Sequence, residues 1–143
     1  MLRSVLPFLA LLLTLSFSSC TKDDAPMPAP VYLLDQHWVL TEMKGQPAPA
    51  AATTDLTLPS SSSNYSGRTY CNGYGGQYEL TPGSPMLRFP TQGSSFASCA
   101  LVEEEIKYLS LLRQTTRYAI SNRTLRFYGP ESEAPLLVFK VAE

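Results

Sequence analysis

The sequence is poor in the residues on which many enzyme, metal and nucleic-acid sites depend. It has one histidine and three cysteines, and 11 Lys and Arg residues are balanced by 12 Asp and Glu residues. Because the basic residues are not clustered, the chain lacks the electrostatic footprint of a nucleic-acid-binding protein. Beyond the N-terminus no apolar run reaches 18 residues, so no membrane-spanning helix is predicted there. We expect no nucleic acid, no metal and no cofactor as partners.

Catalytic motifs are also missing. The serine run at residues 60–63 has no Gly-x-Ser-x-Gly context and indicates a flexible loop. The three glutamates at residues 103–105 are consecutive, and consecutive helical side chains point in different directions, so we interpret them as a solvated first turn. A Cys–His pair of His37 with Cys71 or Cys99 would be lost if the cysteines were joined to each other. We therefore expect no enzymatic activity.

The N-terminus gives the clearest indication of location. Arg3 precedes a short apolar stretch at residues 5–17, and two serines lead directly into Cys20. About 13 apolar-dominated residues are too few to span a bilayer of about 30 Å, but they are typical of a secretory signal peptide. We therefore expect residues 1–19 to be a signal peptide. The alternative is a single N-terminal membrane anchor with an incidental cysteine.

The residues before Cys20 resemble the lipobox of bacterial lipoproteins, although Phe17 stands where leucine is usual. In that class the cysteine thiol receives a diacylglyceryl group, cleavage follows, and the new amine is acylated, with palmitate as a typical chain. Lys22 and the two aspartates after it also resemble a sorting tag of Bacteroidetes-type surface lipoproteins, or they simply solvate a linker. The resemblance implies lipidation at Cys20 and a cell-envelope location in the outer membrane, on its periplasmic or its outer face.

A proline-rich tether at residues 20–33 follows the expected cleavage site. Its three prolines favour an extended polyproline II conformation, and ten such residues hold a domain up to about 30 Å from an anchor. The remaining residues, 34–143, are long enough for one compact domain with a single hydrophobic core. The membrane is therefore the expected partner of the lipid, not of the domain.

Two cysteines remain once Cys20 is assigned to lipid. An exported protein enters an oxidising compartment, where an even remainder tends to pair, so we expect a disulfide between Cys71 and Cys99. The chain-entropy model gives a loop of about 29 residues roughly 3.5 kcal/mol of stabilisation. Metal binding is the competing use, but one histidine and two cysteines fall short of a four-ligand zinc site.

Apolar residues alternate with polar ones through much of the domain and predict strands. Trp38 and Leu40 share one face of the first strand and are candidate core residues. Further strands are predicted at residues 55–58, 65–70, 78–80, 86–89, 118–120, 125–128 and 136–141. The last three are closely spaced and indicate a meander.

The apolar period changes in one segment, which predicts a helix over about residues 100–114. Its apolar stripe consists of Val102, Ile106, Leu109 and Leu112. Ser98 is the expected N-cap. The predicted fold is therefore α+β and mostly antiparallel β, a compact β-barrel-like or strongly curved sheet with one α-helix.

Two short motifs occur in this domain. The first, Cys-Asn-x-Tyr-x-Gly-x-Tyr, is formed by Cys71, Asn72, Tyr74, Gly76 and Tyr78. The second ends at Cys99, just before the predicted helix. In order and spacing the motifs resemble the META/HslJ-like domain family, whose second motif is Thr-x-x-Ala-Cys, with Ser95 and Ser98 here in place of Thr and Ala. The resemblance covers about residues 34–141.

The resemblance implies a compact antiparallel β fold with one helix. Members are bacterial envelope proteins, often lipoproteins, some of them linked to heat-shock induction or novobiocin tolerance, and no enzymatic activity comes with the family. The residue types suggest a structural motif: Gly73, Gly75 and Gly76 permit positive φ or a bulge. Asn72 tolerates left-handed geometry, and Gly76 leaves room for the flanking tyrosine rings.

Two functional classes remain open. The first is a non-enzymatic envelope module for binding or stress tolerance, with a protein, peptide or small-molecule ligand. The alternative is an unrecognised envelope hydrolase or enzyme inhibitor, which a pocket with convergent polar groups would favour. We favour the first class, with Tyr65 and Tyr70 as exposed contact residues, because loops held by a sheet and exposed tyrosines often mediate recognition. Tyr74 and Tyr78 are predicted to lie in the core.

Overall fold

The computed structural model describes residues 31–143. The predicted signal peptide and the lipidation site, Cys20, lie outside the described residues. Within residues 31–143, no helix is both long enough and apolar enough to cross a membrane. Leu33, at the end of the predicted tether, is buried, and its carbonyl accepts a hydrogen bond of 2.9 Å from Trp38 Nε1. The core therefore extends into the last residues of that segment.

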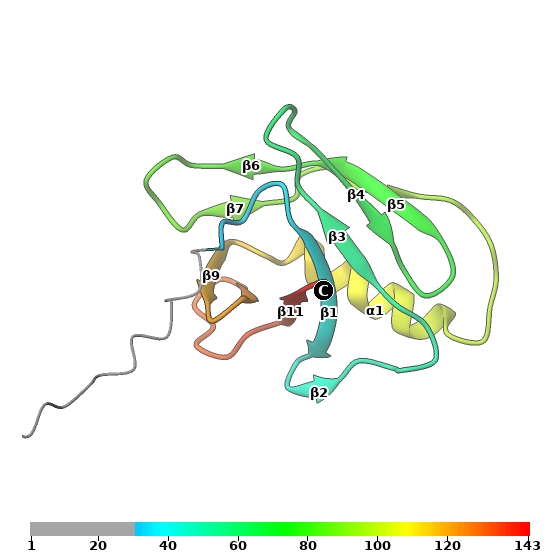
Figure 1. Ribbon diagram of the computed structural model, residues 1–143. Helices are drawn as coiled ribbons and strands as arrows, with labels where there is room; N and C mark the ends of the chain where they lie inside the picture. Colours follow the sequence, from blue (N-terminus) through cyan, green and yellow to red (C-terminus); the bar gives the residue numbers. More distant parts are fainter. Residues whose placement is uncertain (1–30) are drawn as a thin grey trace, which may run out of the picture.

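The described residues form eleven strands and one helix (Figure 1). In chain order these are β1 (His37–Met43), β2 (Gln46–Pro47), β3 (Asp55–Thr57), β4 (Asn64–Arg68), β5 (Gly73–Gln77), β6 (Glu79–Leu80), β7 (Leu87–Arg88), β8 (Gly93–Ser94), α1 (Val102–Arg113), β9 (Arg117–Ser121), β10 (Thr124–Tyr128) and β11 (Leu137–Val141). The predicted C-terminal meander is confirmed as β9–β11, while β5 occupies the glycine-rich stretch, which lies outside the predicted strands.

One large antiparallel sheet has the strand order β8-β5-β4-β3-β1-β11-β10-β9, with β2 paired to β1. A two-stranded ribbon of β6 and β7 projects from it in Figure 1. β7 also runs along β9, because Met86 and Arg117 form a bridge and the N–H of Leu87 donates to the carbonyl of Thr116 at 3.1 Å. The sheet does not close into a barrel. Of the two predicted forms, the structure has the strongly curved sheet with one helix.

β1 shows how the sequence pattern directs side chains into the core. Trp38 and Leu40 are buried, as predicted from their two-residue spacing. Met43 is also buried although it breaks this spacing, because the register with β11 shifts between Leu40 and Glu42. Such an irregularity reverses the face on which the following residues lie. The shift therefore brings a third apolar side chain of β1 into the core.

The core is built around aromatic rings that contact one another in a closed circuit. In order around the circuit they are Tyr74, Tyr65, Phe89, Phe127, Phe139 and Tyr108. Neighbouring ring centroids are 4.9 to 6.4 Å apart, within the range for favourable tilted and edge-to-face pairs. Tyr108 comes from α1, so this circuit attaches the helix to the inner face of the sheet.

The predicted helix exists, but its buried face differs from the predicted apolar stripe. The buried residues are Glu105, Tyr108, Leu111 and Leu112, whereas 63% of Ile106 is exposed. The N-cap is Leu101 rather than Ser98, and no side chain caps the first turn. The spacing of apolar residues does not predict this face, because the face includes the carboxylate of Glu105.

Candidate functional site

The two sequence motifs meet at the turn that joins β4 to β5. Thr69 and Asn72 close this turn, since the N–H of Thr69 donates to the Asn72 carbonyl at 2.7 Å. Cys71 and Cys99 are joined by a disulfide with a Cα–Cα distance of 5.7 Å, in agreement with the expected pairing. The disulfide links the turn to the loop before α1. Residues far apart in the sequence therefore form one cluster.

Glu105 of α1 lies at the centre of this cluster. Its Oε2 accepts hydrogen bonds from the backbone N–H groups of Cys71 at 3.0 Å and Asn72 at 3.1 Å, and from the Thr69 hydroxyl. Its Oε1 accepts a bond of 2.7 Å from the Asn72 side-chain amide. Burial disfavours the charged form, but the hydrogen bonds from Thr69, Asn72 and Cys71 outweigh it, so the pKa of Glu105 is lowered.

The interpretation of residues 103–105 as a solvated turn is therefore wrong for Glu105. Glu103 is exposed, and Glu104 is half-buried and lies 3.6 Å from Lys107 Nζ. Glu105 points toward the β4–β5 turn, where backbone N–H groups that form no strand hydrogen bond need an acceptor. In the sequence, the position of Glu105 three residues before the buried Tyr108 is the one sign that its side chain lies on the buried face.

Asn72 holds the loop that precedes α1. Its side-chain amide donates to the carbonyl of Ala97 at 3.0 Å, and its Oδ1 accepts bonds from the Ala97 N–H at 2.7 Å and the Ser95 hydroxyl at 3.1 Å. Ser95, which replaces the threonine of the second motif, thus keeps a hydroxyl at this position. Asn72 is not among the residues with positive φ, so it does not use the left-handed geometry that asparagine tolerates.

The expectation that Tyr65 and Tyr70 form an exposed contact surface is wrong. Only 2% of Tyr65 and 8% of Tyr70 is exposed. Tyr65 donates a hydrogen bond of 3.0 Å to the carbonyl of Thr91, and its burial raises its pKa to about 12. The sequence could not reveal this, because the partner that allows the hydroxyl to be buried is a backbone carbonyl 26 residues away.

Tyr74 and Tyr78 are buried, as predicted. The Tyr74 hydroxyl is hydrogen-bonded to Tyr108 and donates to the Asp55 carbonyl, and the Tyr78 hydroxyl reaches the carbonyl of Pro59 at 2.9 Å. Burial raises the pKa of Tyr74 well above its ordinary value. These tyrosines are internal cross-links between strands and loops.

The glycines of the first motif allow the backbone of neighbouring segments to approach closely. A Cβ atom on Gly76 would lie 2.0 Å from the carbonyl oxygen of Thr91, and one on Gly75 would lie 2.8 Å from that of Tyr65. None of Gly73, Gly75 and Gly76 has positive φ, so the first of the two possibilities, positive φ or a bulge, does not apply to them. The room at Gly76 is taken by the Thr91 backbone rather than by tyrosine rings.

A groove runs between β8 and α1, and we call it the α1 groove. It consists of two adjoining hollows of about 260 and 290 Å³, which share Ser94, Ile106 and Leu109. The first also includes Asn72, Ser95, Phe96, Ala97, Ser98, Val102 and Glu105, and the second includes Gln92, Gly93 and Arg113. Phe96 stands at its rim with its whole side chain in solvent, at a relative exposure of 105%.

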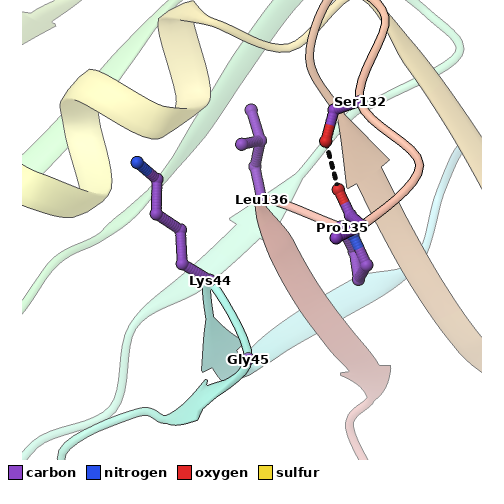
Figure 2. Close-up of a pocket in the computed structure, with 6 residues that line it drawn as sticks. Lys44, Gly45, Ser132, Pro135 and Leu136 are labelled. Atoms are coloured by element: carbon purple, nitrogen blue, oxygen red, sulfur yellow. Dashed lines mark hydrogen bonds between the residues drawn. The ribbon is translucent and has the colours of Figure 1, made fainter.

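A separate hollow of about 390 Å³ lies between the β1–β2 turn and the start of β11 (Figure 2). It is lined by Lys44, Gly45, Ser132, Ala134, Pro135 and Leu136. The Ser132 hydroxyl is held by the carbonyl of Ala134 at 2.6 Å. Lys44 is the single ionisable residue of this lining, so the hollow supplies no acid–base pair.

The one histidine lies apart from the disulfide. His37 Nε2 is 3.0 Å from Asp55 Oδ2, and 54% of the histidine side chain is exposed. With both cysteine sulfurs in a disulfide, His37 forms no Cys–His pair. Within residues 31–143 no group of three or more His, Cys, Asp or Glu residues is placed to hold a metal ion.

Known structures share this fold. The chain resembles a protein from Burkholderia xenovorans solved by NMR, with 24% identity, a TM-score of 0.59, and coverage of 85% of this chain and 96% of that one. A crystal structure of a DUF4847 family protein from Bacteroides vulgatus matches with 12% identity, a TM-score of 0.57, and coverage of 76% and 93%. A comparison with curated proteins gave no match.

A family model identifies the domain. The META domain model matches residues 31–143, which include every strand described above, α1, and both sequence motifs. The match spans well over half of the chain, and the residues of the first motif account for the disulfide, the Asn72 hydrogen bonds and the buried tyrosines. The chain therefore belongs to the META domain family.

Proposed function

We propose that this META-domain protein is a non-catalytic binding module, held at the cell envelope by a lipid on Cys20. Phe96 and the α1 groove form its contact surface. The observation that carries this proposal is a completely exposed phenylalanine on a loop that is fixed on both sides. Large exposed aromatic residues are enriched at protein interfaces and often dominate their energy.

The loop around Phe96 is ordered before any partner arrives. Ser95 and Ala97, its two neighbours, both bond to the side chain of Asn72, and the disulfide joins Cys99 to Cys71 in the β4–β5 turn. A contact residue that is already held in place loses little conformational entropy on binding. Ile106, which is 63% exposed on the adjacent turn of α1, continues the apolar surface.

Two ionisable groups support a non-catalytic role: Glu105, which lines the groove, and Tyr74, which is buried in the core. Glu105 accepts four hydrogen bonds from its own chain, so its oxygens are occupied and its lowered pKa makes it a weak base. Burial raises the pKa of Tyr74, so this hydroxyl stays protonated and hydrogen-bonded at neutral pH. A general acid or base needs a pKa near the working pH and access to substrate, which neither group has.

The lipid anchor is supported by the N-terminal sequence and is tested by acyl labelling. Cells that produce the full chain are fed an alkyne-bearing fatty acid, and the purified protein is examined for the label. The wild type is expected to be labelled, and Cys20→Ala should carry no label and keep its signal peptide. Label that persists in Cys20→Ala would overturn the assignment.

The contact surface is tested by cross-linking in intact cells. Phe96→Asp places a charge on the proposed contact, and Tyr32→Asp is the matched control, because Tyr32 is an aromatic residue with 70% exposure outside the groove. Formaldehyde adducts of the wild type and of Tyr32→Asp should be similar, and Phe96→Asp should lose them. Equal adducts in all three proteins would show that the contact surface lies elsewhere.

A further inference from the structure

We propose that β8, Phe96 and the α1 groove together form a twofold interface with a second copy of this chain. This inference rests on the proposed binding role and identifies its partner. Three observations carry it: β8 ends the sheet, an exposed ring stands beside a hollow that can receive one, and the charges of α1 are complementary to themselves.

The edge of β8 has backbone groups available for pairing. β8 pairs with β5 through Gly93 and Ser94, and the N–H of Ser95 donates to the carbonyl of Gly73 at 3.0 Å. In an antiparallel ladder, residues alternate between bonding to one neighbour and facing away from it. Ser94 therefore directs its N–H and C=O away from β5, and a Cβ at Gly93 would contact nothing within 4 Å.

A twofold axis at Ser94 would bring Phe96 of each copy to the groove of the other. When a strand pairs antiparallel with its own copy about residue 94, residue 96 lies opposite residue 92. Gln92 lines the second hollow of the α1 groove, together with Ile106, Leu109 and Arg113. Its volume of about 290 Å³ is ample for one ring, since a cavity of about 150 Å³ holds benzene.

The charges of α1 fit the same twofold arrangement. Its first turn is acidic, with Glu103 exposed and Glu104 paired to Lys107 at 3.6 Å, and its last turn carries Arg113. Two copies of this helix that run antiparallel across the axis bring the acidic end of each near the basic end of the other. Twofold interfaces need this self-complementarity, since the same patch contacts itself.

Photo-cross-linking of the full chain in cells tests the identity of the partner. Two copies with different tags are produced together, each with benzoylphenylalanine in place of Phe96, which preserves an aromatic side chain. Irradiation should give an adduct of twice the mass that carries both tags. The same photoreactive residue in place of Tyr32 is the control and should give no such adduct.

Cysteine cross-linking provides a second measurement that does not alter the ring. Ser94→Cys should form an intermolecular disulfide under mild oxidation, and Ser121→Cys, on β9 at the opposite end of the sheet, should not. Adding Phe96→Asp to Ser94→Cys should reduce this cross-link about tenfold or more, as expected for a central contact. All the substituted side chains are exposed, so the fold is retained.

The outcomes separate this inference from the proposed function. A Phe96 adduct with a different protein would overturn the second copy as partner and leave the binding role in place. An adduct with lipid, or no adduct together with no Ser94 cross-link, would overturn both. A dimeric adduct with both tags, dependent on Phe96, supports the twofold interface.

Discussion

The two sides of the Cys71–Cys99 disulfide differ sharply in exposure. On the β5 side, Asn72 and Tyr74 are buried and hydrogen-bonded to the rest of the domain. On the loop side, Phe96 and Cys99 lie in solvent. The buried side supplies the hydrogen bonds that fix the exposed side. The buried residues of the first motif thus maintain the shape of a surface to which they contribute almost no area.

This comparison separates two kinds of substitution. A change on the β5 side should reduce stability, and it should affect recognition only by loosening the loop. A change on the loop side should affect recognition with little cost in stability, since an exposed side chain has few contacts to lose. Measurements of stability and of recognition on the same variants can therefore test this distinction.

The largest expected effect is that of Glu105→Leu. This substitution removes the acceptor of four hydrogen bonds, so the Cys71 N–H loses its acceptor, while the Asn72 N–H and the Thr69 hydroxyl keep only the bonds between their two residues. Hydrogen bonds to a charged group contribute about 1.5–3 kcal/mol each, so we expect a loss of at least about 3 kcal/mol in the free energy of unfolding. Urea denaturation measures it. A loss no greater than that of the exposed control Glu103→Leu would contradict the role of the cluster.

Removal of the disulfide should cause the second-largest loss in the free energy of unfolding. Replacing Cys71 and Cys99 together by alanine should cost about 2–4 kcal/mol, because the unfolded chain regains the freedom that the loop closure removes. The Asn72 hydrogen bonds to Ser95 and Ala97 remain, so the loop should stay attached once the protein is folded. Hydrogen exchange of the Ala97 amide measures this. Complete loss of its protection would show that the disulfide alone holds the loop.

The hydroxyl of Tyr74 should have a smaller effect. Tyr74→Phe keeps the ring contacts with Tyr65 and Tyr108 but removes the hydrogen bonds to Tyr108 and to the Asp55 carbonyl. We expect a loss of about 1–2 kcal/mol from the groups left unpaired. Tyr118→Phe, on the half-buried β9, is the control. A neutral result for Tyr74→Phe would mean that the aromatic circuit alone accounts for its burial.

Acid should weaken the hydrogen bonds of the buried Glu105. The folded-state pKa of Glu105 lies below its unfolded value of 4.5, so its contribution to stability is present above that value and is lost as pH falls through the folded pKa. Hydrogen bonds from Ser60 also lower the pKa of Asp35, so acid should reduce the contribution of Asp35 to stability as well. The difference between wild type and Glu105→Gln isolates the first contribution. It should shrink below pH 4.5, and a constant difference would rule out titration of Glu105.

The fold was largely predictable from the sequence because its determinants are local. The alternation in β1, the spacing of the last three strands and the period of α1 gave the correct fold class and the correct helix position. Leu112 and Trp38 were correctly assigned to the core. The META resemblance, carried by the first motif, agrees with the family match.

The site was much less predictable because its determinants are non-local. Glu105 is buried only because donors 33 and 34 residues away point at it, and Tyr65 is buried only because Thr91 supplies an acceptor. Polar and amphipathic residues are assigned to the surface by pattern, and these residues lie inside because each has a partner. Phe96 is the converse case, since an apolar residue in a loop gives no sign in the sequence that it is completely exposed.

The smallest expected effect on stability is that of Phe96→Ala. Its side chain makes no hydrogen bond and is completely exposed, so the free energy of unfolding should change by less than about 0.5 kcal/mol. The same variant should lose the cross-linked adducts of the full chain in cells, because the ring is the proposed contact. Tyr65→Ala should give the opposite result, with a loss of about 3–5 kcal/mol as for other buried aromatic residues. If Phe96→Ala instead lowered stability and left the adducts intact, the ring would belong to the scaffold, and the distinction between the two sides of the disulfide would fail.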